Sequence, residues 1–333
     1  MPEPTRAFLV SSEVVFGART VPSEDVDAAF LMPPGKLRTR AGILSLAHAV
    51  AEETEVTLGA RAADLALRRA AAPAREIDLI LASTETYLAV PSLAAHLHRA
   101  IGAQERCGAM DIGGACLGFV HALAVAKTFV ESGQARVVLV VTADVHSRTL
   151  LPGRVPGEFG GLFGDGASAF LVKRRAAGQA AEGFALREFF FGCLPQYQQA
   201  IQVCAEPNDR LRVVFDGDAL SRAATARLHE CIEELERRSG FERAGVAAFA
   251  THQPNPRLVA LLAKKAGVPL ERFPLVADKR GNLGSTTCAA ALHYSTKLPP
   301  RPGAGPQPVF LASLGPGLLY GAGWLERPDP GAG

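Results

Sequence analysis

The chain has no long apolar run, no paired cysteines and no excess of charge of either sign. No apolar stretch in its 333 residues reaches the roughly 18 residues of a membrane-spanning helix. The N-terminus lacks the basic-then-apolar order of a secretory signal, so the sequence predicts a cytoplasmic location and no membrane partner. A formal net charge of +2 with 20% charged residues speaks against a general nucleic-acid binder.

Cysteine is present, but its spacing favours neither a metal site nor a disulfide framework. None of the six cysteines forms a C-x-x-C pair, which speaks against zinc. With 48% hydrophobic residues, a chain of this length buries a large core without disulfides. Most of the cysteines are therefore expected to be packing residues; they are Cys107, Cys116, Cys193, Cys204, Cys231 and Cys288.

One cysteine stands apart because of the turn in which it lies. Cys116 follows the small residues 113–115 and precedes a helix that apolar spacing predicts over 117–131, ended by Gly133. Free backbone N–H groups and the dipole at a helix N-terminus favour a thiolate, which is a nucleophile. The small residues would let a substrate carbonyl approach the sulfur. From this stretch alone, a buried structural cysteine is the alternative.

Strands alternate with helices along the chain, which predicts an α/β fold with a mostly parallel sheet. Segments 36–43 and 147–161 are expected to be loops, the second at the mouth of a pocket. Buried strands are expected at 77–83, 135–142, 245–250 and 308–313, and helices at 23–30, 53–71, 92–101, 219–238, 256–266 and 288–296.

The two halves of the chain follow one plan, which predicts an internal duplication. Strand 77–84 corresponds to 245–252, and the turn before the Cys116 helix corresponds to the turn that carries Asn282. We divide the chain into an N-terminal half with the nucleophilic cysteine, a connecting segment and a C-terminal half with His252 and Asn282. Their bounds are 1–173, 174–210 and 211–333.

Three polar side chains stand at the ends of apolar strands or the starts of apolar helices. Singly, His252 has the ordinary interpretation of a capped loop residue, and Asn282 that of a turn residue. Together with Cys116, in this order and with these neighbours, they predict one catalytic site at the end of a buried tunnel. The remaining histidines are expected to be structural or exposed; they are His96, His98, His121, His146 and His293.

With their neighbours, these residues resemble the thiolase superfamily, and within it β-ketoacyl-acyl-carrier-protein synthase III. The resemblance spans nearly the whole chain and implies an internally duplicated, five-layered αβαβα thiolase fold in a homodimer. It is carried by the motifs at Asp111–Gly118, Phe163–Ala167, His252–Arg257, Gly281–Thr286 and Leu314–Gly317.

The resemblance implies a two-step reaction. Cys116 would take an acyl group from an acyl thioester, with an oxyanion hole formed by its own N–H and an N–H of Gly315 or Gly317. His252 and Asn282 would then donate hydrogen bonds to the thioester oxygen of a malonyl group. Loss of CO2 leaves an enolate, which attacks the acyl group and forms a β-ketoacyl product. The amide of Asn282 donates without transferring a proton, which suits decarboxylation.

The resemblance also implies contacts with substrates and partners, and no cofactor besides the acyl-CoA, malonyl-CoA or acyl-carrier thioesters themselves. Val90 stands where acetyl-selective members carry Phe, and Lys36 and Gly157 replace the Trp and Arg that stack adenine, so a longer acyl chain than acetyl is expected. The implied sites are the acyl pocket (Val90 across a dimer, Leu162, Phe163), the carrier-protein surface (Arg257, Lys264, Lys265) and the phosphopantetheine entrance (Arg40, Arg154, Asn255).

Three functions remain open at this point. The first is a decarboxylating condensing enzyme of fatty-acid or secondary-metabolite biosynthesis. The second is an acyltransferase on the same fold that moves the acyl group to an alcohol or amine without decarboxylation. The third, a non-catalytic subunit, is disfavoured because Cys116, His252 and Asn282 are all present. For the basic residues on helix 256–266, a solvated face is the alternative to carrier-protein binding.

Overall fold

The computed structural model of the protein describes residues 6–175, 183–207, 210–299 and 307–327. Residues 1–5, which carry part of the prediction of no secretory signal, lie outside these ranges. No helix in the described part of the chain is long and apolar enough to cross a membrane.

The N-terminal half alternates strands and helices as predicted. Its strands are β1 (Arg6–Phe16), β2 (Arg19–Pro22), β3 (Ser45–His48), β4 (Leu79–Ser83), β5 (Gly108–Asp111), β6 (Val137–Val145) and β7 (Asp165–Arg175). Its helices are α1 (Ser23–Ala29), α2 (Glu55–Arg69), α3 (Leu93–Ala100), α4 (Gly118–Glu131) and α5 (Gly157–Gly160), with short turns η1 (Leu37–Ala41), η2 (Ala74–Glu76), η3 (Ala115–Leu117) and η4 (His146–Arg148).

The rest of the chain repeats this alternation. Its strands are β8 (Phe184–Cys193), β9 (Ile201–Glu206), β10 (Arg210–Phe215), β11 (Ala248–Thr251), β12 (Gln307–Gly315) and β13 (Leu319–Arg327). Its helices are α6 (Gly217–Ser239), α7 (Pro256–Ala266), α8 (Ala277–Arg280) and α9 (Ser285–Lys297), with turns η5 (Pro195–Tyr197), η6 (Leu270–Arg272) and η7 (Pro316–Leu318).

Within the described residues, the main sheet has the strand order β11-β12-β13-β8-β1-β7-β6-β4-β5. β4 is parallel to β6, and antiparallel pairs then join β6 to β7 and β7 to β1. In the other half, β11 is parallel to β12, and antiparallel pairs join β12 to β13 and β13 to β8. The same order of strand directions occurs twice, which confirms the predicted duplication.

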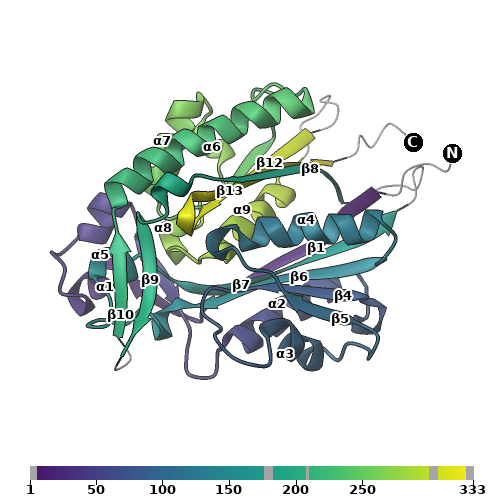
Figure 1. Ribbon diagram of the computed structural model, residues 1–333, viewed down its shortest axis with the longest axis horizontal. Helices are drawn as coiled ribbons and strands as arrows, with labels where there is room; N and C mark the ends of the chain where they lie inside the picture. Colours follow the sequence, from purple (N-terminus) through teal and green to yellow (C-terminus); the bar gives the residue numbers. More distant parts are fainter. Residues whose placement is uncertain (1–5, 176–182, 208–209, 300–306, 328–333) are drawn as a thin grey trace.

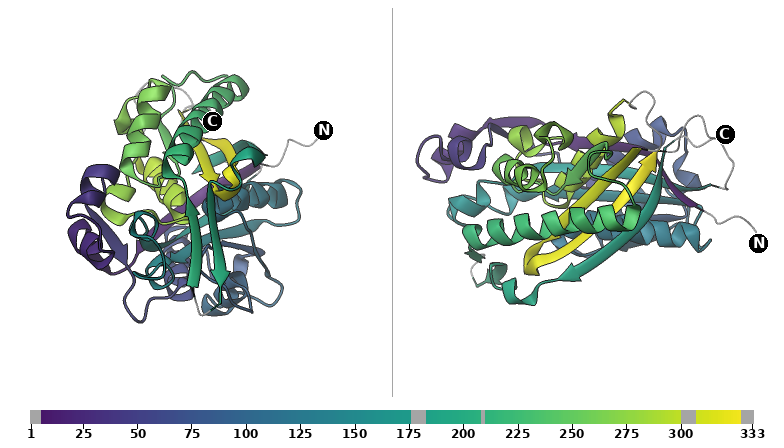
Figure 2. Two further views of the ribbon diagram at one scale, coloured as in Figure 1. Left: turned by 60° about the vertical axis from the view of Figure 1, so that its left-hand side comes forward. Right: turned by 90° about the horizontal axis from the view of Figure 1, so that it is seen from above.

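The two halves of the sheet enclose α4 and α9, and this gives the predicted five layers (Figures 1 and 2). Side chains alternate between the faces of each strand. Leu79 and Leu81 of β4 pack into the central layer with α4 and α9, whereas Ile80 and Ala82 pack against α2 and α3. Helices α6 and α7 cover the outer face of the other half. The architecture therefore follows from strands that are apolar on both faces.

The segment 174–210 is more than the predicted connection. Residues 184–193 form β8, which lies between β13 and β1 in the main sheet. Its sequence signal is weak because only its first three residues are fully buried. Further along, β9 and β10 form an antiparallel hairpin beside α6.

Two segments that were predicted as loops contain helical turns, η1 in 36–43 and α5 in 147–161. Ser23 is the first residue of α1, and its hydroxyl donates to Glu24 Oε2. The start of α7 is as predicted: the side chain of Asn255 accepts from Leu258 N at 2.9 Å, and Pro256 is the first helical residue.

Candidate active site

Cys116 lies in the turn η3, directly before α4, and its side chain is buried. Gly114, at φ +134°, makes the sharp approach to this turn; a Cβ there would lie 2.5 Å from the ring of His121. The carbonyl of Cys116 accepts a hydrogen bond from Ser313 Oγ of β12 at 2.7 Å. The two halves of the duplication thus meet at the predicted nucleophile.

His252 follows β11 and is buried at the same end of the sheet. Its backbone N–H donates to the carbonyl of Ala312 in β12 at 3.0 Å, which fixes the residue just past the strand. Burial lowers the pKa of His252 to about 4, against a smaller opposing effect of Glu85. At neutral pH the imidazole is therefore uncharged and has one N–H to donate.

Asn282 lies in the turn before α9, and its side-chain oxygen is already engaged. Oδ1 accepts from Gly284 N at 3.0 Å and from Thr287 Oγ1 at 3.2 Å. These contacts leave the amide nitrogen as the donor of the side chain. Asn282 is 4% exposed, so an acceptor that reaches this nitrogen is largely removed from water.

The turn of Asn282 is held by the glycine-rich motif before β7. Asn282 N donates to Leu162 O at 2.8 Å, and Gly164 N donates to Asn282 O at 2.9 Å. A Cβ on Gly164 would lie 2.0 Å from the carbonyl oxygen of Arg280, so only glycine lets the two segments approach this closely. Gly164 is not among the residues that line the cavity, so its role is to position Asn282.

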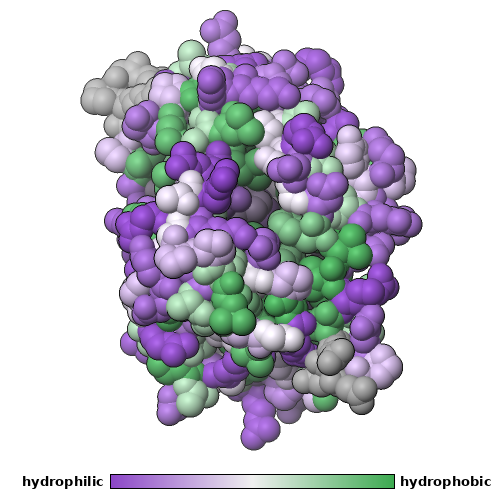
Figure 3. Space-filling model, turned by 90° about the vertical axis from the view of Figure 1, so that its left-hand side faces the viewer, coloured by the Kyte–Doolittle hydropathy of each residue, from purple (hydrophilic) through white to green (hydrophobic). Residues whose placement is uncertain are grey.

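Cys116, His252 and Asn282 line one cavity of about 520 Å³, which confirms that they converge as predicted. Most of its wall is apolar. The cavity opens toward the face formed by α1, α5 and the β9–β10 hairpin, which Figure 3 shows as a hollowed surface with hydrophobic patches. An apolar tunnel that ends at a cysteine suits a thioester carried on a long, flexible arm.

The predicted acyl-pocket residues divide into two groups. Leu162 and Phe163 line the cavity, but Val90 does not; it is 97% exposed and lies on the surface of the chain. A role for Val90 in a neighbouring chain stays a prediction. The sequence analysis missed Ile201 and Phe215, which line the cavity from the β9–β10 hairpin. No motif marked them, because the hairpin approaches the site only through tertiary packing.

Two of the three predicted entrance residues line the cavity, and the third does not. Arg40 and Asn255 line the cavity, with Asn255 as the N-cap of α7. Arg154 is not among the lining residues; it donates to Thr149 O at 3.0 Å, within its own loop. Lys36 lines the mouth and pairs with Glu158 at 2.5 Å. The charged residues of the lining are therefore the basic Lys36, Arg40 and Arg257 and the acidic Glu158 and Asp218.

The predicted carrier-protein surface lies on α7. Arg257, at its start, lines the cavity and donates to Thr39 O at 3.1 Å. Lys264 and Lys265 are exposed in the last turn of the same helix. Basic side chains therefore extend from the cavity mouth along one helix.

The two predicted oxyanion glycines have different positions. Gly315 lines the cavity, and a Cβ on it would lie 3.7 Å from Cys116 N. Gly317 is not among the lining residues, and its carbonyl accepts from Cys193 Sγ. Of the two predicted glycines, Gly315 is therefore the one that lies beside the backbone of Cys116, and its role in an oxyanion hole stays a prediction.

The predicted thiolate is not the resting state of Cys116. Burial raises the pKa of the thiol well above its ordinary value, and the negative charge of Glu85 raises it further. Burial and Glu85 thus outweigh the effect of the helix N-terminus on the pKa of Cys116. The resting site holds a thiol, whose proton must leave when the sulfur attacks.

His146, which is buried, and Glu85, which is partly buried, lie near Cys116 although no sequence motif marks them. His146 was expected to be structural or exposed. Glu85 follows β4 as Gln253 follows β11, so the duplication itself was the signal that could have drawn attention to it. No group of three or more metal-binding side chains occurs among the described residues.

Comparisons with known proteins identify the family of the chain. The family model described as 3-oxoacyl-[acyl-carrier-protein] synthase III matches residues 110–188, and its C-terminal counterpart matches residues 237–327. The chain is 31% identical over 293 residues to the β-ketoacyl-[acyl-carrier-protein] synthase III of Haemophilus ducreyi, covering 86% of this chain and 89% of that protein.

Solved structures show the same fold. The 3-oxoacyl-(acyl carrier protein) synthase III of Pseudomonas aeruginosa superposes with a TM-score of 0.85 at 23% identity, over 97% of this chain and 99% of that one. The priming β-ketosynthase of the R1128 polyketide pathway gives 0.84 at 28% identity, over 99% and 98%. Fold and site thus define a condensing enzyme of the thiolase fold. The chain belongs to the β-ketoacyl-acyl-carrier-protein synthase III family and is an acyltransferase.

Proposed function

We propose that this enzyme transfers an acyl group from a thioester to Cys116 and then condenses it with a malonyl thioester, with loss of CO2, to a β-ketoacyl product. The observation that carries this proposal is the cavity in which the Cys116 thiol, the neutral ring of His252 and the free amide nitrogen of Asn282 meet.

In the first half-reaction, Cys116 Sγ attacks the thioester carbonyl and the carrier thiol leaves. The backbone N–H groups of Cys116 and Gly315 are the proposed donors to the developing oxyanion. The product of this step is an acyl-enzyme thioester at the end of the apolar tunnel.

In the second half-reaction, the malonyl thioester oxygen accepts hydrogen bonds from His252 and Asn282. Breaking the bond to the carboxylate releases CO2 and leaves its electron pair as an enolate, which the two donors stabilise. The enolate carbon then bonds to the acyl carbon, and the C–S bond to Cys116 breaks. A neutral histidine and an amide suit this step because neither takes a proton from the substrate.

The cavity supports delivery of the substrate on a phosphopantetheine arm. Lys36, Arg40 and Arg257 surround the mouth, and Lys264 and Lys265 continue the basic surface on α7. An acidic acyl carrier protein or the phosphates of coenzyme A would be attracted there. A specialised pathway is supported by the likeness to the R1128 priming β-ketosynthase at 28% identity. The homodimer, the cytoplasmic location and the length of the acyl chain stay predictions.

The direct test is to supply a panel of acyl thioesters with carboxyl-labelled malonyl thioester and to measure labelled CO2 and the mass added to Cys116. We expect the wild type to gain acyl mass and to release labelled CO2 during condensation. Cys116→Ala should gain no acyl mass and should release no CO2 through condensation. Asn282→Ala should gain acyl mass but release CO2 slowly. A wild type that gains no acyl mass with any donor would refute the proposal.

A second function, acyl transfer to an alcohol or amine, is favoured by one observation. Glu85 places a buried negative charge beside Cys116, which repels a malonyl carboxylate and could take a proton from a neutral acceptor. Acyl transfer to such an acceptor, with no CO2 released from malonyl thioesters, would establish this second function instead.

A further inference from the structure

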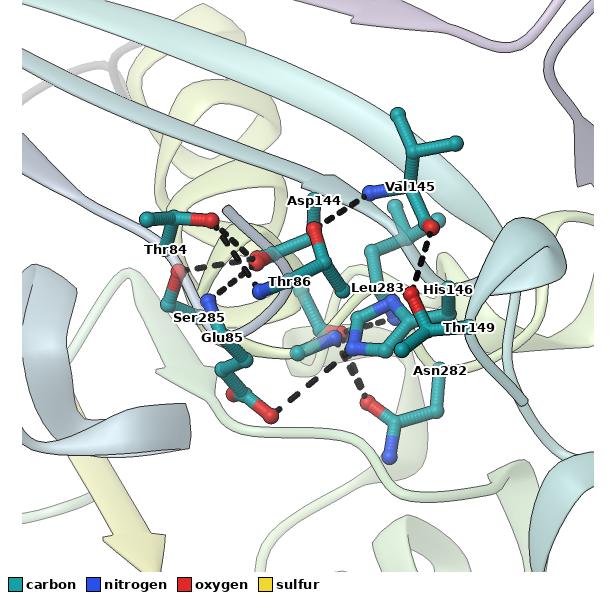
Figure 4. A network of polar contacts seen from close by, with 12 residues as sticks. Thr84, Glu85, Thr86, Asp144, Val145, His146, Thr149, Asn282, Leu283 and Ser285 are labelled. Atoms are coloured by element: carbon teal, nitrogen blue, oxygen red, sulfur yellow. Dashed lines mark hydrogen bonds and ion pairs between the residues drawn. The ribbon is translucent and has the colours of Figure 1, made fainter. Parts of the chain in front are cut away.

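The backbone N–H of Glu85 fixes the position of this residue in the site. Glu85 lies in the turn after β4, where its N–H donates to Asp144 Oδ1 at 2.6 Å. Asp144, at the end of β6, also accepts from Thr84 Oγ1 at 3.2 Å and from Ser285 Oγ of α9 at 3.1 Å. Figure 4 shows these contacts converging on Asp144. The turn is therefore fixed from two strands and a helix.

The carboxylate of Glu85 forms an ion pair with the ring of His146. Glu85 Oε2 lies 3.7 Å from His146 Nε2, and His146 Nδ1 lies 3.1 Å from the carbonyl oxygen of Gly164, to which it donates (Figure 4). Burial favours the neutral ring, but Glu85 and Asp144 outweigh it and raise the pKa of His146 to about 9. The imidazolium in turn outweighs burial and lowers the pKa of Glu85. At neutral pH both groups are charged.

The second oxygen of Glu85 is buried and has no hydrogen-bond partner among the described residues. A Cβ on Gly284 would lie 2.8 Å from this Oε1 and 2.9 Å from His146 Cε1. Gly284 is also the residue whose N–H holds Asn282 Oδ1. The unpaired Oε1 of Glu85 therefore lies next to Gly284, in the turn that carries Asn282.

The charge of Glu85 acts on the nucleophile. Its carboxylate interacts with the Cys116 thiol, whose pKa it raises, and with His252. The charged or titratable groups around Cys116 are Glu85, Asp144, His146 and His252; of these, His252 is neutral and His146 is already protonated. Burial raises the pKa of Asp144 to about 7, and both of its oxygens already accept hydrogen bonds. Of the described groups, Glu85 is therefore the ionised one that has a carboxylate oxygen without a hydrogen-bond partner.

We propose that Glu85 is the general base for the acylation of Cys116, with His146 as its positioning residue. Oε1 accepts the thiol proton while Sγ bonds to the thioester carbonyl carbon. When the tetrahedral intermediate collapses, the bond to the leaving sulfur breaks and Glu85 returns the proton to that thiolate. No charge is left behind, and the carboxylate is regenerated. This inference rests on the proposed function only through acyl transfer to Cys116, which precedes any decarboxylation.

The test is single-turnover acylation, followed as mass added to Cys116, in wild type and Glu85→Gln between about pH 6 and about pH 9.5. We expect Glu85→Gln to acylate about 10²-fold more slowly at pH 7, the usual contribution of a general base. The difference narrows as pH rises, because the thiolate then forms without a base. Glu85→Asp keeps a carboxylate and recovers part of the rate.

Alkylation of Cys116 by iodoacetamide separates catalysis from structure. Removing the neighbouring negative charge lowers the thiol pKa, so the midpoint of alkylation moves to lower pH in Glu85→Gln although acylation is slower. Glu55→Gln is the matched control: Glu55 accepts from Thr86 Oγ1 in the same turn at 2.7 Å without reaching Cys116. We expect Glu55→Gln to acylate within about twofold of wild type, because glutamine keeps an oxygen that accepts the hydrogen bond from Thr86.

Two results would overturn the inference. One is wild-type acylation by Glu85→Gln at neutral pH. The other is a slowing that is equal at every pH with an unmoved alkylation midpoint, which marks a structural role. If His252→Gln abolishes acylation while Glu85→Gln does not, the base is His252. A wild type that gains no acyl mass refutes the proposed function instead, so the two failures are distinguishable.

Discussion

At the scale of single residues, the site is built from side chains with one end fixed and the other free. Asn282 is held through its oxygen, and Glu85 has one oxygen near His146 and one without a partner. Such side chains are oriented before the substrate arrives, which lowers the cost of organising the transition state.

Asn282→Asp tests this orientation. The change replaces the free N–H donor by a second oxygen that would repel an enolate, while the contacts of the first oxygen are kept. We expect CO2 release to fall about 10²- to 10³-fold, the usual effect of one lost oxyanion donor. Acylation of Cys116, measured as added mass, should change little. Equal losses in both half-reactions would show that Asn282 has a general structural role.

His252 makes stability depend on pH. Its pKa is about 4 in the folded protein against an ordinary 6.5, so between these values the unfolded chain binds more protons. The stabilisation by the neutral ring is complete above pH 6.5 and is lost as pH falls toward 4. We expect His252→Gln to reduce this slope, removing up to about 3 kcal/mol of pH dependence, measured by urea unfolding. Parallel curves for variant and wild type would contradict the assignment.

At the scale of elements, the site depends on close approach between segments far apart in sequence. The glycine-rich motif before β7 pairs with the turn before α9, and Ser313 of β12 bonds to the turn of Cys116. Asn282 and Cys116 are therefore each held by an element from the opposite half, whereas His252 is held within its own half by Ala312 of β12.

Gly164→Ala tests the closest of these contacts. Its Cβ would lie 2.0 Å from the carbonyl oxygen of Arg280, so the turn of Asn282 must move. We expect a loss of about 2 kcal/mol or more in the free energy of unfolding, and a larger loss of CO2 release than of acylation. Gly133→Ala is the control: it meets the cost of a positive φ, about 1 kcal/mol, without a clash. Similar losses in both variants would argue against the packing explanation.

The lysines of α7 are tested by charge reversal. Lys264→Glu with Lys265→Glu places two negative charges where an acidic carrier protein is proposed to dock. We expect KM for acyl-carrier thioesters to rise about tenfold and the effect to weaken at high salt, with little change for acyl-CoA. Lys173→Glu, at the end of β7 and outside the cavity lining, is the matched control. An equal increase of KM for both donors would refute carrier-protein docking at α7.

At the scale of the whole molecule, two large apolar side chains are exposed on the surface of a single chain. Leu88 and Val90, which precede α3, are 89% and 97% exposed. This arrangement agrees with the prediction that a second copy receives Val90 in its acyl pocket.

Analytical ultracentrifugation should therefore give twice the chain mass, and Val90→Phe should shift acylation toward short chains. We expect the rate ratio of a two-carbon to an eight-carbon donor to rise about tenfold, because a bulkier side chain shortens the pocket. A monomer, or an unchanged ratio in a dimer, would contradict the predicted role of Val90.

The sequence by itself determined the repeated order of strands and helices, because burial on both faces of a strand and capping of helices are local patterns. It also predicted that Cys116, His252 and Asn282 meet, since each lies at the end of a strand or in a turn within a motif of the family. The start of α7 at Asn255 and Pro256 was equally local.

Only the tertiary structure decided which other groups share the site. Glu85 and His146, which form an ion pair, and Phe215, which lines the cavity, belong to separate elements that only tertiary packing brings there. The ionisation of Cys116 was also decided there: the helix N-terminus is a local feature, but burial and the charge of Glu85 come from the fold and outweigh it.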